Sequence, residues 1–416
     1  MWFDIRFHAN DMPAILDRLF GLVDMSYWDR RDRDFDAKSK NGPFAEQFFD
    51  SRFSVERALL QAQKIFRSTG QYPLHGQPDS MIEAFNIAAL IVRVFDRVSD
   101  YGRGIIAGRI RDALAGQSLG FNPFAVEIGV AAHLMMMGYD VTFMEFENQA
   151  RFDLLAERDG ARIEIDCKAI SADLGRPIHS QQLYALGDVA YGDMLALAKR
   201  GGGYYIELMP AGSLHNSHDV ERVASLLRQT LGCRHDYDMR DIGKARWVEF
   251  AIDESWFMGN GRPTAEFGTF LRQHRPAGAA HLLCVRPPGA GGVFVDVVGA
   301  TGDHTQESMY RELRRSRNDQ FSRTFPASIA VRLVDLDASQ ISSLADRQRS
   351  WLPQVATRLF GSTERRHLHS LAFLAPAADM NAAGDLRSNT GRAWSFTNPT
   401  HPDAGDERLR LYPSTP

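Results

Sequence analysis

The stretch IEIDCKAI, residues 163–170, decides the fold that we predict for this chain. Side chains of a β-strand alternate between its two faces. Glu164, Asp166 and Lys168 therefore point one way, and Ile165 and Cys167 point the other. An otherwise apolar strand thus carries a charged face at its centre, and this pattern requires an explanation in terms of stability or chemistry.

The segment before this strand predicts an antiparallel partner. Residues 151–157, RFDLLAE, read as a strand, and Arg158-Asp159-Gly160 is a hairpin signal. Twelve residues separate Asp153 from Asp166, which is about what two paired strands and a short turn require. We therefore expect Asp153 to lie near Asp166.

A third carboxylate lies on an apolar helix predicted for Pro123 to Met137. Glu127 shares a helical face with Val130, Ala131 and Leu134, and that face should pack on the sheet. A buried carboxylate costs free energy unless a positive charge compensates it. A bound cation near Glu127 would supply that charge.

Carboxylates from one helix and two strands form a set of ligands that suits Mg²⁺ or Mn²⁺, which prefer hard oxygen ligands. We predict Asp153, Asp166 and Glu127 as metal ligands, with the backbone carbonyl of Cys167 as a further ligand. Such an ion can activate a water and stabilise charge on a phosphodiester. Lys168 would orient the attacking water or stabilise the transition state.

These residues resemble the motif of the PD-(D/E)XK, or restriction-endonuclease-like, superfamily. The run of Glu127, RFD ending at Asp153 and IEIDCK ending at Lys168 has Asp at the D/E position. The superfamily core has an acidic helix, a three-stranded meander, then a helix and a strand. We predict the same order here, with strands at Tyr139–Phe146, Phe152–Glu157 and Arg162–Ile170, a helix at Ile178–Lys199 and a strand at Tyr204–Met209. The sequence departs from the pattern in having Phe152 before the aspartate and no QxxxY directly after the lysine, only Gln181, Gln182 and Tyr184.

The resemblance implies an endonuclease dependent on Mg²⁺ or Mn²⁺ that hydrolyses phosphodiester bonds of nucleic acid, with DNA favoured over RNA as the substrate. Its catalytic residues would be Glu127, Asp153, Asp166 and Lys168. The superfamily's usual roles are restriction, repair and defence against phage, so an anti-phage role is an expectation from resemblance alone.

Two groups of residues are predicted to contact substrate phosphates. One follows the lysine strand and consists of Arg176, His179 and Gln182. The other shares a face of a basic helix at Gln306–Phe321 and consists of Arg311, Arg314 and Arg315. An ordinary helix start and a solvated helix surface are the respective alternatives.

The expected fold is mixed α+β, with a restriction-endonuclease-like core in which helices flank a central mixed sheet. Residues 1–118 are predicted as a helical region for recognition, regulation or oligomerisation. Residues 119–375 would form the nuclease-like domain with a C-terminal α/β extension, and residues 376–416 a loop-rich tail. The charge-alternating stretch Trp28 to Asp36 is expected to be a solvated loop or a helix end.

Composition places the chain among soluble globular proteins. Its 416 residues are 44% hydrophobic and 24% charged, with a net charge of -4 that argues against a nonspecific nucleic-acid coat. Three cysteines without a CxxC pattern suit a reducing compartment, and we expect a cytoplasmic location with no membrane segment. Homo-oligomerisation is left open.

Two other classes of function remain open. A catalytically silent endonuclease-like module would bind nucleic acid or a partner protein and keep the fold without cleavage. A structural or interaction protein would carry Asp153, Asp166 and Lys168 as a chance pattern on a salt-bridged strand, and would bind no divalent metal.

Overall fold

The computed structural model describes residues 7–73, 78–116, 119–214, 216–257, 264–274, 282–299, 304–336, 341, 344–345, 351–361, 366–375, 379–380, 385–387 and 393–412. The chain divides into two compact units. Unit 1 comprises Met1–Asp36, Phe49–Leu174 and Gln306–Pro416, and unit 2 comprises Ala37–Phe48 and Gly175–Thr305. These units cut the chain at other places than residues 118 and 375, and the predicted domain ranges stay a prediction.

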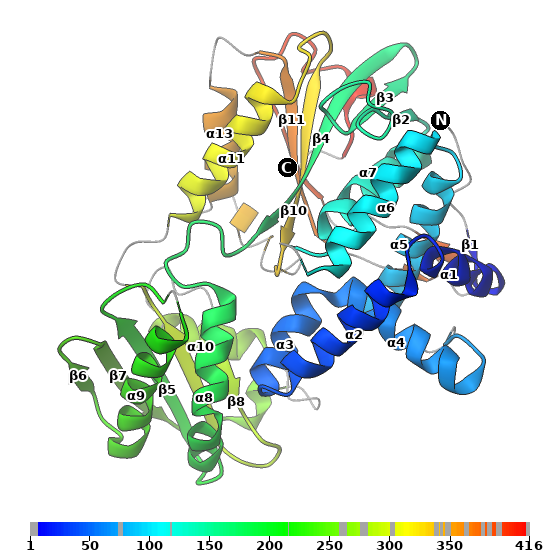
Figure 1. Cartoon of the computed structure of the whole chain (residues 1–416). Helices are drawn as coiled ribbons and strands as arrows, with labels where there is room; N and C mark the ends of the chain where they lie inside the picture. Colours follow the sequence, from blue (N-terminus) through cyan, green and yellow to red (C-terminus); the bar gives the residue numbers. More distant parts are fainter. Residues whose placement is uncertain are drawn as a thin grey trace. The chain divides into compact units, whose positions relative to one another are not determined.

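The predicted fold class is confirmed: helices dominate the N-terminal part and mixed sheets follow (Figure 1). The N-terminal helices are α1 (Met12–Phe20), α2 (Met25–Ser39), α3 (Pro43–Arg52), α4 (Ser54–Thr69), α5 (Asp79–Phe95) and α6 (Asp100–Leu114). The expectation of a solvated loop or a helix end at Trp28 to Asp36 was wrong, because this stretch lies within α2. Trp28, Arg31 and Phe35 recur at helical spacing and are buried, so one buried stripe, in which the Arg31 guanidinium lies over the Phe35 ring, fixes the helix.

A buried carboxylate fixes the start of the helix that carries Glu127. Glu56 of α4 is fully buried, and its Oε1 accepts a hydrogen bond from the backbone N–H of Phe121 at 3.0 Å. Gly120 precedes that residue with φ +59°, and a Cβ there would meet Glu56 Oε1 at 1.8 Å. Glycine is therefore required where the chain passes this carboxylate. Glu56 and Gly120 together set the entry into α7 (Asn122–Met136).

This buried carboxyl group should make stability depend on pH. Burial raises the pKa of Glu56 from 4.5 to about 7, although Arg31 and the Phe121 N–H offset part of the effect. Because the folded-state pKa is the higher one, the group stabilises the fold below about pH 4.5, and this contribution is lost as the pH rises through about 7. The shift corresponds to about 3 kcal/mol.

Glu56→Gln keeps an acceptor for the Phe121 N–H but cannot ionise. The free energy of unfolding of the wild type, minus that of the variant, should fall by about 3 kcal/mol between pH 4.5 and 8. Denaturant unfolding of both proteins across that range measures the difference. Parallel pH curves for the two proteins would contradict the expected titration of Glu56.

The central sheet belongs to unit 1. Among the described residues its strands run in the order β14-β11-β10-β4-β3-β2. Their bounds are β2 (Asp140–Phe143), β3 (Leu154–Arg158), β4 (Ala161–Ser171), β10 (Ala327–Val334), β11 (Leu368–Leu374) and β14 (Ala393–Thr397). Asp159 and Gly160 both have positive φ, 51° and 79°, so the predicted hairpin between β3 and β4 is confirmed.

The strand predicted at Tyr204–Met209 is confirmed as β5 (Gly203–Pro210), but its expected place in the core was wrong, because β5 belongs to a different sheet. Instead β10 pairs in parallel with β4, with Ile329 opposite Asp166 and Val331 opposite Lys168. The helix before β10 is α11 (Thr305–Asp319). Unit 2 is thus inserted in the sequence between β4 and the helix and strand that continue its sheet.

Helices cover both faces of this sheet (Figure 1). Helix α7 packs against β4 on one face. On the other face α11 and α13 (Trp351–Phe360) enclose an apolar core. That core includes Met309, Leu313, Ile329, Leu352 and Leu371.

Three short strands complete the described strands of unit 1. Strands β1 (Phe7–His8), β13 (Asp385–Arg387) and β12 (Asp379–Met380) form a separate antiparallel sheet. Part of the segment expected to be a loop-rich tail is instead ordered, because β14 pairs with β11. Tyr412 is buried and stacks on His133 of α7 with ring centroids 4.5 Å apart. Burial of these aromatic groups favours a fixed C-terminal segment over a solvated one.

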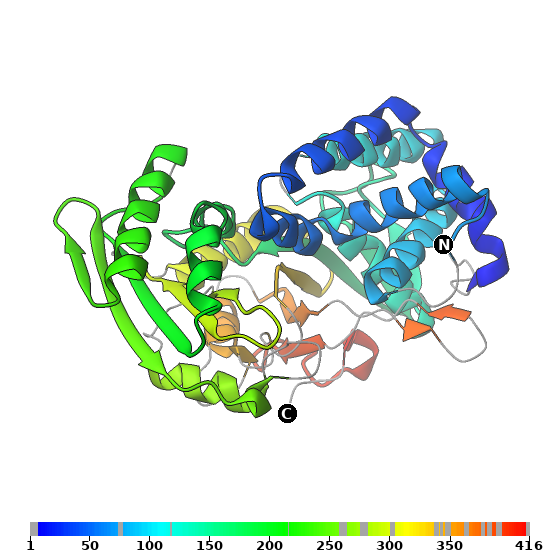
Figure 2. The same cartoon turned by 90° about the horizontal axis from the view of Figure 1, so that it is seen from below.

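Unit 2 has its own sheet, in the order β6-β7-β5-β9-β8 among the described residues. Its elements are α8 (Ser180–Ala198), β5 (Gly203–Pro210), α9 (Ser217–Cys233), β6 (Tyr237–Met239), β7 (Gly243–Phe250), α10 (Ala265–His274), β8 (Leu282–Val285) and β9 (Gly292–Val297). Figure 2 shows α8 and α9 on one side of this sheet and α10, in yellow-green, on the other.

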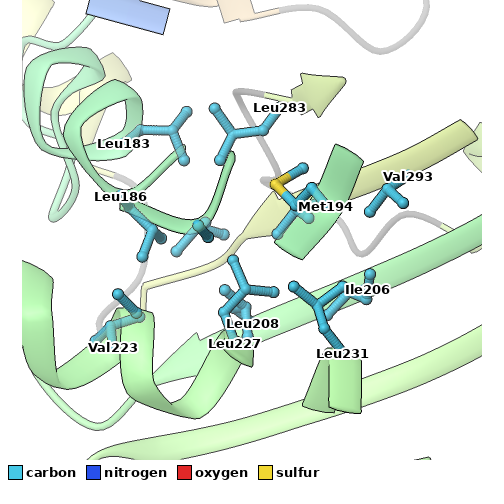
Figure 3. Packing of buried hydrophobic residues seen from close by; sticks show 14 of the residues in the cluster. Leu183, Leu186, Met194, Ile206, Leu208, Val223, Leu227, Leu231, Leu283 and Val293 are labelled. Atoms are coloured by element: carbon cyan, nitrogen blue, oxygen red, sulfur yellow. The ribbon is translucent and has the colours of Figure 1, made fainter. Parts of the chain in front are cut away.

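The side under α8 and α9 is a packed aliphatic core (Figure 3). Met194 of α8, Leu227 of α9 and Ile206 of β5 are all fully buried there. The segment Ala37–Phe48 joins this unit through Asp188 of α8, whose carboxylate accepts from the backbone N–H groups of Phe44 and Ala45, both at 2.8 Å. A side chain of α8 thus caps the N-terminus of α3.

Candidate metal centre

Glu127 lies where the apolar helix predicts it. It is on the sheet-facing side of α7 and is 6% exposed. Its carboxylate has a positive partner that the sequence did not indicate, since Arg109 of α6 donates from Nη1 to Glu127 Oε2. The same guanidinium donates from Nη2 to Oε2 of Glu145 at 2.6 Å. One arginine therefore bridges two carboxylates.

Asp153 is fixed at the point where β3 begins. Its Oδ2 accepts a hydrogen bond from the backbone N–H of Cys167 on β4 at 2.6 Å. The backbone N–H of Asp153 donates to the carbonyl oxygen of Ile165 at 3.1 Å. In a strand the N–H and C=O of one residue point to the same side. The carbonyl of Cys167 therefore also points toward β3, and its role as a metal ligand stays a prediction.

Asp166 and Lys168 share a face of β4, and the structure joins them directly. Lys168 Nζ donates to Asp166 Oδ1 at 3.1 Å. The hydroxyl of Ser316 on α11 donates to the other oxygen of Asp166. Asp166 is 1% exposed, so both of its oxygens are held inside the fold.

Glu164, one pleat away, has a different set of partners. Its carboxylate accepts from the backbone N–H of Ser322 at 2.9 Å and also from the Ser322 hydroxyl. Both of its oxygens are therefore bound by the segment that follows α11. This residue holds the chain between α11 and β10 in place.

The closest group of possible metal ligands among the described residues is Glu127, Glu145 and Asp153. One carboxylate oxygen from each lies within 4.8 Å of the others. Glu127 and Asp153 are two of the three predicted carboxylates, whereas Asp166 is not in this group. Glu145 was missed because we read Tyr139–Phe146 as one strand, but β2 ends at Phe143 and the following turn brings Glu145 back toward Glu127.

Burial and mutual repulsion raise the pKa of the acidic groups. Burial raises the pKa of Glu127 to about 7 in spite of Arg109. Burial, and then the charges of Glu127 and Asp166, raise the pKa of Asp153 well above its usual range. Burial also raises the pKa of Asp166, although Lys168 offsets part of this rise. The charges of these three carboxylates thus act on one another, and a further positive charge would stabilise their ionised forms.

The pKa of Lys168 is also raised, but burial acts on it in the opposite direction. Burial by itself lowers the pKa of its ammonium group, but the charges of Asp166 and Asp153 outweigh burial and raise that pKa. Lys168 is therefore a cation at neutral pH. The site combines this cation with carboxylates that an additional cation would stabilise.

The first predicted substrate group lies in unit 2, whereas the carboxylates lie in unit 1. Arg176 and His179 precede α8, and Gln182 is in its first turn. The predicted contact of Arg176, His179 and Gln182 with substrate stays a prediction.

The second predicted group is on α11 of unit 1. Arg311, Arg314 and Arg315 are exposed, and Arg311 pairs with Glu307 at 3.1 Å. The next residue after Arg315 is Ser316, which contacts Asp166. The helix that presents these arginines therefore also contacts the charged strand.

The QxxxY spacing that we did not find after the lysine does occur on α11, as Gln306 and Tyr310. Residues of unit 2 lie between Lys168 and this helix in the sequence. Gln306 Nε2 donates to Gln354 Oε1 of α13 at 2.9 Å. The guanidinium of Arg358 lies over the Tyr310 ring at 3.8 Å. Both side chains therefore contact α13.

Comparisons of the chain with protein-family models, curated proteins and solved structures found no match. The assignment of function therefore rests on the residues and their geometry.

Proposed function

We propose that this chain is a metal-dependent nuclease of the PD-(D/E)XK type that hydrolyses phosphodiester bonds in nucleic acid, with DNA preferred to RNA. The observation that carries the proposal is the convergence of Glu127 and Asp153 beside the strand that holds Asp166 and Lys168. A meander of β2, β3 and β4, followed by α11 and the parallel strand β10, supplies the expected frame.

The residues present fit Mg²⁺ or Mn²⁺. Glu127, Glu145 and Asp153 offer hard oxygen atoms within 4.8 Å of one another, and two of these groups are desolvated. When bound, the ion would activate a water and polarise the phosphate. Asp166 contributes negative charge to the same centre and holds the ammonium group of Lys168.

Lys168 is the group that would act on the reacting phosphate. Its side chain is 25% exposed, whereas that of its partner Asp166 is 1% exposed. A lysine kept charged by Asp166 and Asp153 can stabilise the negative charge that develops on the phosphoryl oxygens. The exposed arginines of α11 would hold the flanking backbone through charge, without reading sequence.

The biological role that we propose is restriction or defence against phage.

No helix in the described part of the chain is long and apolar enough to cross a membrane. The N-terminal helices would serve recognition, regulation or oligomerisation.

Cleavage assays test the proposal directly. Plasmid, linear and single-stranded DNA, and RNA, are incubated with the purified protein and Mg²⁺ or Mn²⁺. We expect metal-dependent cleavage that EDTA abolishes. The nuclease proposal would be rejected if no substrate were cleaved and calorimetry showed no binding of divalent ions.

A second candidate is a catalytically silent endonuclease-like module that binds nucleic acid or a partner protein. The observation that favours it is the pairing of Arg109 with both Glu127 and Glu145, which satisfies these carboxylates within the chain. Such a module would bind nucleic acid equally well with EDTA and would not cleave it.

Divalent ions should raise the thermal stability of the protein. A ligand that binds only the folded state stabilises it by about 2.7 kcal/mol at a hundred times its dissociation constant. We expect the melting temperature to rise with millimolar Mg²⁺ or Mn²⁺, and Asp153→Asn to lose this rise. An equal rise in the variant would place the bound ion elsewhere in the protein.

A further inference from the structure

Arg109 occupies a place at the acidic centre that the motif does not account for. It lies in α6 (Asp100–Leu114), and its two terminal nitrogens donate to Glu127 and to Glu145. These are two of the three carboxylates that lie within 4.8 Å of one another. The guanidinium is thus bound to the same groups that would hold a divalent ion.

Two aromatic rings keep this guanidinium in position. Its central carbon lies 5.0 Å from the centroid of Phe146 and 6.0 Å from that of Phe124. Cation–π contacts of this kind hold an arginine at a defined place on a surface. Arg109 therefore does not depend on the two ion pairs alone for its position.

The two carboxylate partners of Arg109 differ in their exposure to solvent. The side chain of Glu127 is 7% exposed, that of Arg109 is 23% exposed, and that of Glu145 is 43% exposed. One arm of the fork therefore contacts a buried carboxylate, and the other contacts a carboxylate open to solvent. A ligand from solvent can replace Glu145 without disturbing Glu127.

A phosphate group is suited to that replacement. The planar fork of arginine matches two oxygens of a carboxylate or of a phosphate equally well. A divalent ion held by Glu127 and Glu145 would compete with the guanidinium for their oxygens, and the N–H groups of Arg109 could then bind a new anion. The only anion that the proposed reaction brings to this place is the phosphodiester.

We propose that Arg109 binds the phosphodiester of the substrate beside the metal centre and exchanges its carboxylate partner for the phosphate when the ion is bound. This inference rests on the proposed function. It adds a residue from α6 to a site otherwise built from α7, the segment between β2 and β3, and β4.

The test compares three variants in the full-length protein. Arg109→Lys keeps the charge beside buried Glu127 but lacks the planar fork, and Arg109→Gln removes the charge. Arg103→Lys is the matched control, since Arg103 lies on the same helix and pairs with exposed Asp100 at 3.0 Å. Calorimetry measures Ca²⁺ and Mn²⁺ binding, and fluorescence anisotropy measures binding of a short DNA duplex in Ca²⁺.

We expect both Arg109 variants to bind DNA about tenfold to a hundredfold more weakly, which is the loss of one or two charge-assisted hydrogen bonds. Ion affinity should be unchanged or higher, because a competing cation has been weakened or removed. Arg103→Lys should match the wild type in both measurements.

The melting temperature separates a binding defect from a folding defect. Arg109→Lys should melt within a few degrees of the wild type and still show the DNA defect. Wild-type DNA affinity in Arg109→Lys and Arg109→Gln overturns the inference and leaves the nuclease proposal intact. Loss of ion affinity in proportion to DNA affinity assigns Arg109 to holding the carboxylates instead, and a wild type that binds no ion overturns both proposals.

Discussion

Asp153→Asn is expected to lower the cleavage rate at least about a thousandfold while leaving the chain folded. Asparagine keeps an oxygen that can accept from the Cys167 N–H, so the junction of β3 and β4 is retained. It lacks the negative charge that a divalent ion requires from its ligands. Losing a metal ligand removes several kcal/mol of transition-state stabilisation, and about 4 kcal/mol corresponds to a thousandfold in rate.

Glu157→Gln is the matched control for Asp153→Asn. Glu157 lies on β3, which begins directly after Asp153, and its carboxylate pairs with Arg162 at 2.6 Å on the exposed part of the hairpin. This variant should cleave at the wild-type rate, because exposed ion pairs contribute little. Single-turnover cleavage of a labelled duplex in Mg²⁺ measures both rates. A near wild-type rate for Asp153→Asn would exclude this carboxylate as a metal ligand.

Asp166→Asn and Glu164→Gln form the second large contrast. Both residues point to the same face of β4 and both are 1% exposed. Asp166 holds Lys168 and acts electrostatically on Glu127 and Asp153, whereas Glu164 contacts Ser322. We expect Asp166→Asn to cleave at least about a thousandfold more slowly and Glu164→Gln to lose about tenfold or less.

Lys168 explains why Asp166 should matter even though it lies outside the closest group of three carboxylates. Replacing Asp166 by asparagine removes the partner that holds the ammonium group at 3.1 Å and lowers the negative charge of the centre. Circular dichroism would check that each variant is folded. A dead Glu164→Gln variant beside an active Asp166→Asn variant would place the motif one pleat away from our assignment.

The insertion of unit 2 places the strand with Asp166 and Lys168 far in the sequence from the helix that follows it in the sheet of unit 1. Its residues Gly175–Thr305 separate β4 from α11, which is the helix that continues the sheet of unit 1. Surface connections tolerate long insertions, since the entropy of loop closure grows only slowly with length. The contact of Ser316 with Asp166 spans 150 positions of the sequence for this reason.

Residue patterns predicted the local part of the site. Strand alternation predicted that Asp166 and Lys168 share a face, and they form an ion pair. The Asp159-Gly160 turn predicted the hairpin that brings Asp153 to β4, and both residues have the positive φ that such a turn needs. The burial of Glu127 followed from helical spacing on an apolar helix. Each of these features depends on residues close together in the chain.

Long-range packing selects the distant segments that join this local part of the site. A buried strand such as β5 and one such as β10 have the same apolar pattern, so sequence cannot choose the partner of β4, and β10 takes that place because α11 packs on the sheet. Glu145 joins the carboxylates through a turn that ends β2 three residues earlier than we expected. Arg109 reaches them from a neighbouring helix through side-chain contacts that leave no periodic signal. Local periodicity therefore defined the charged strand, and long-range packing defined the partners that complete its site.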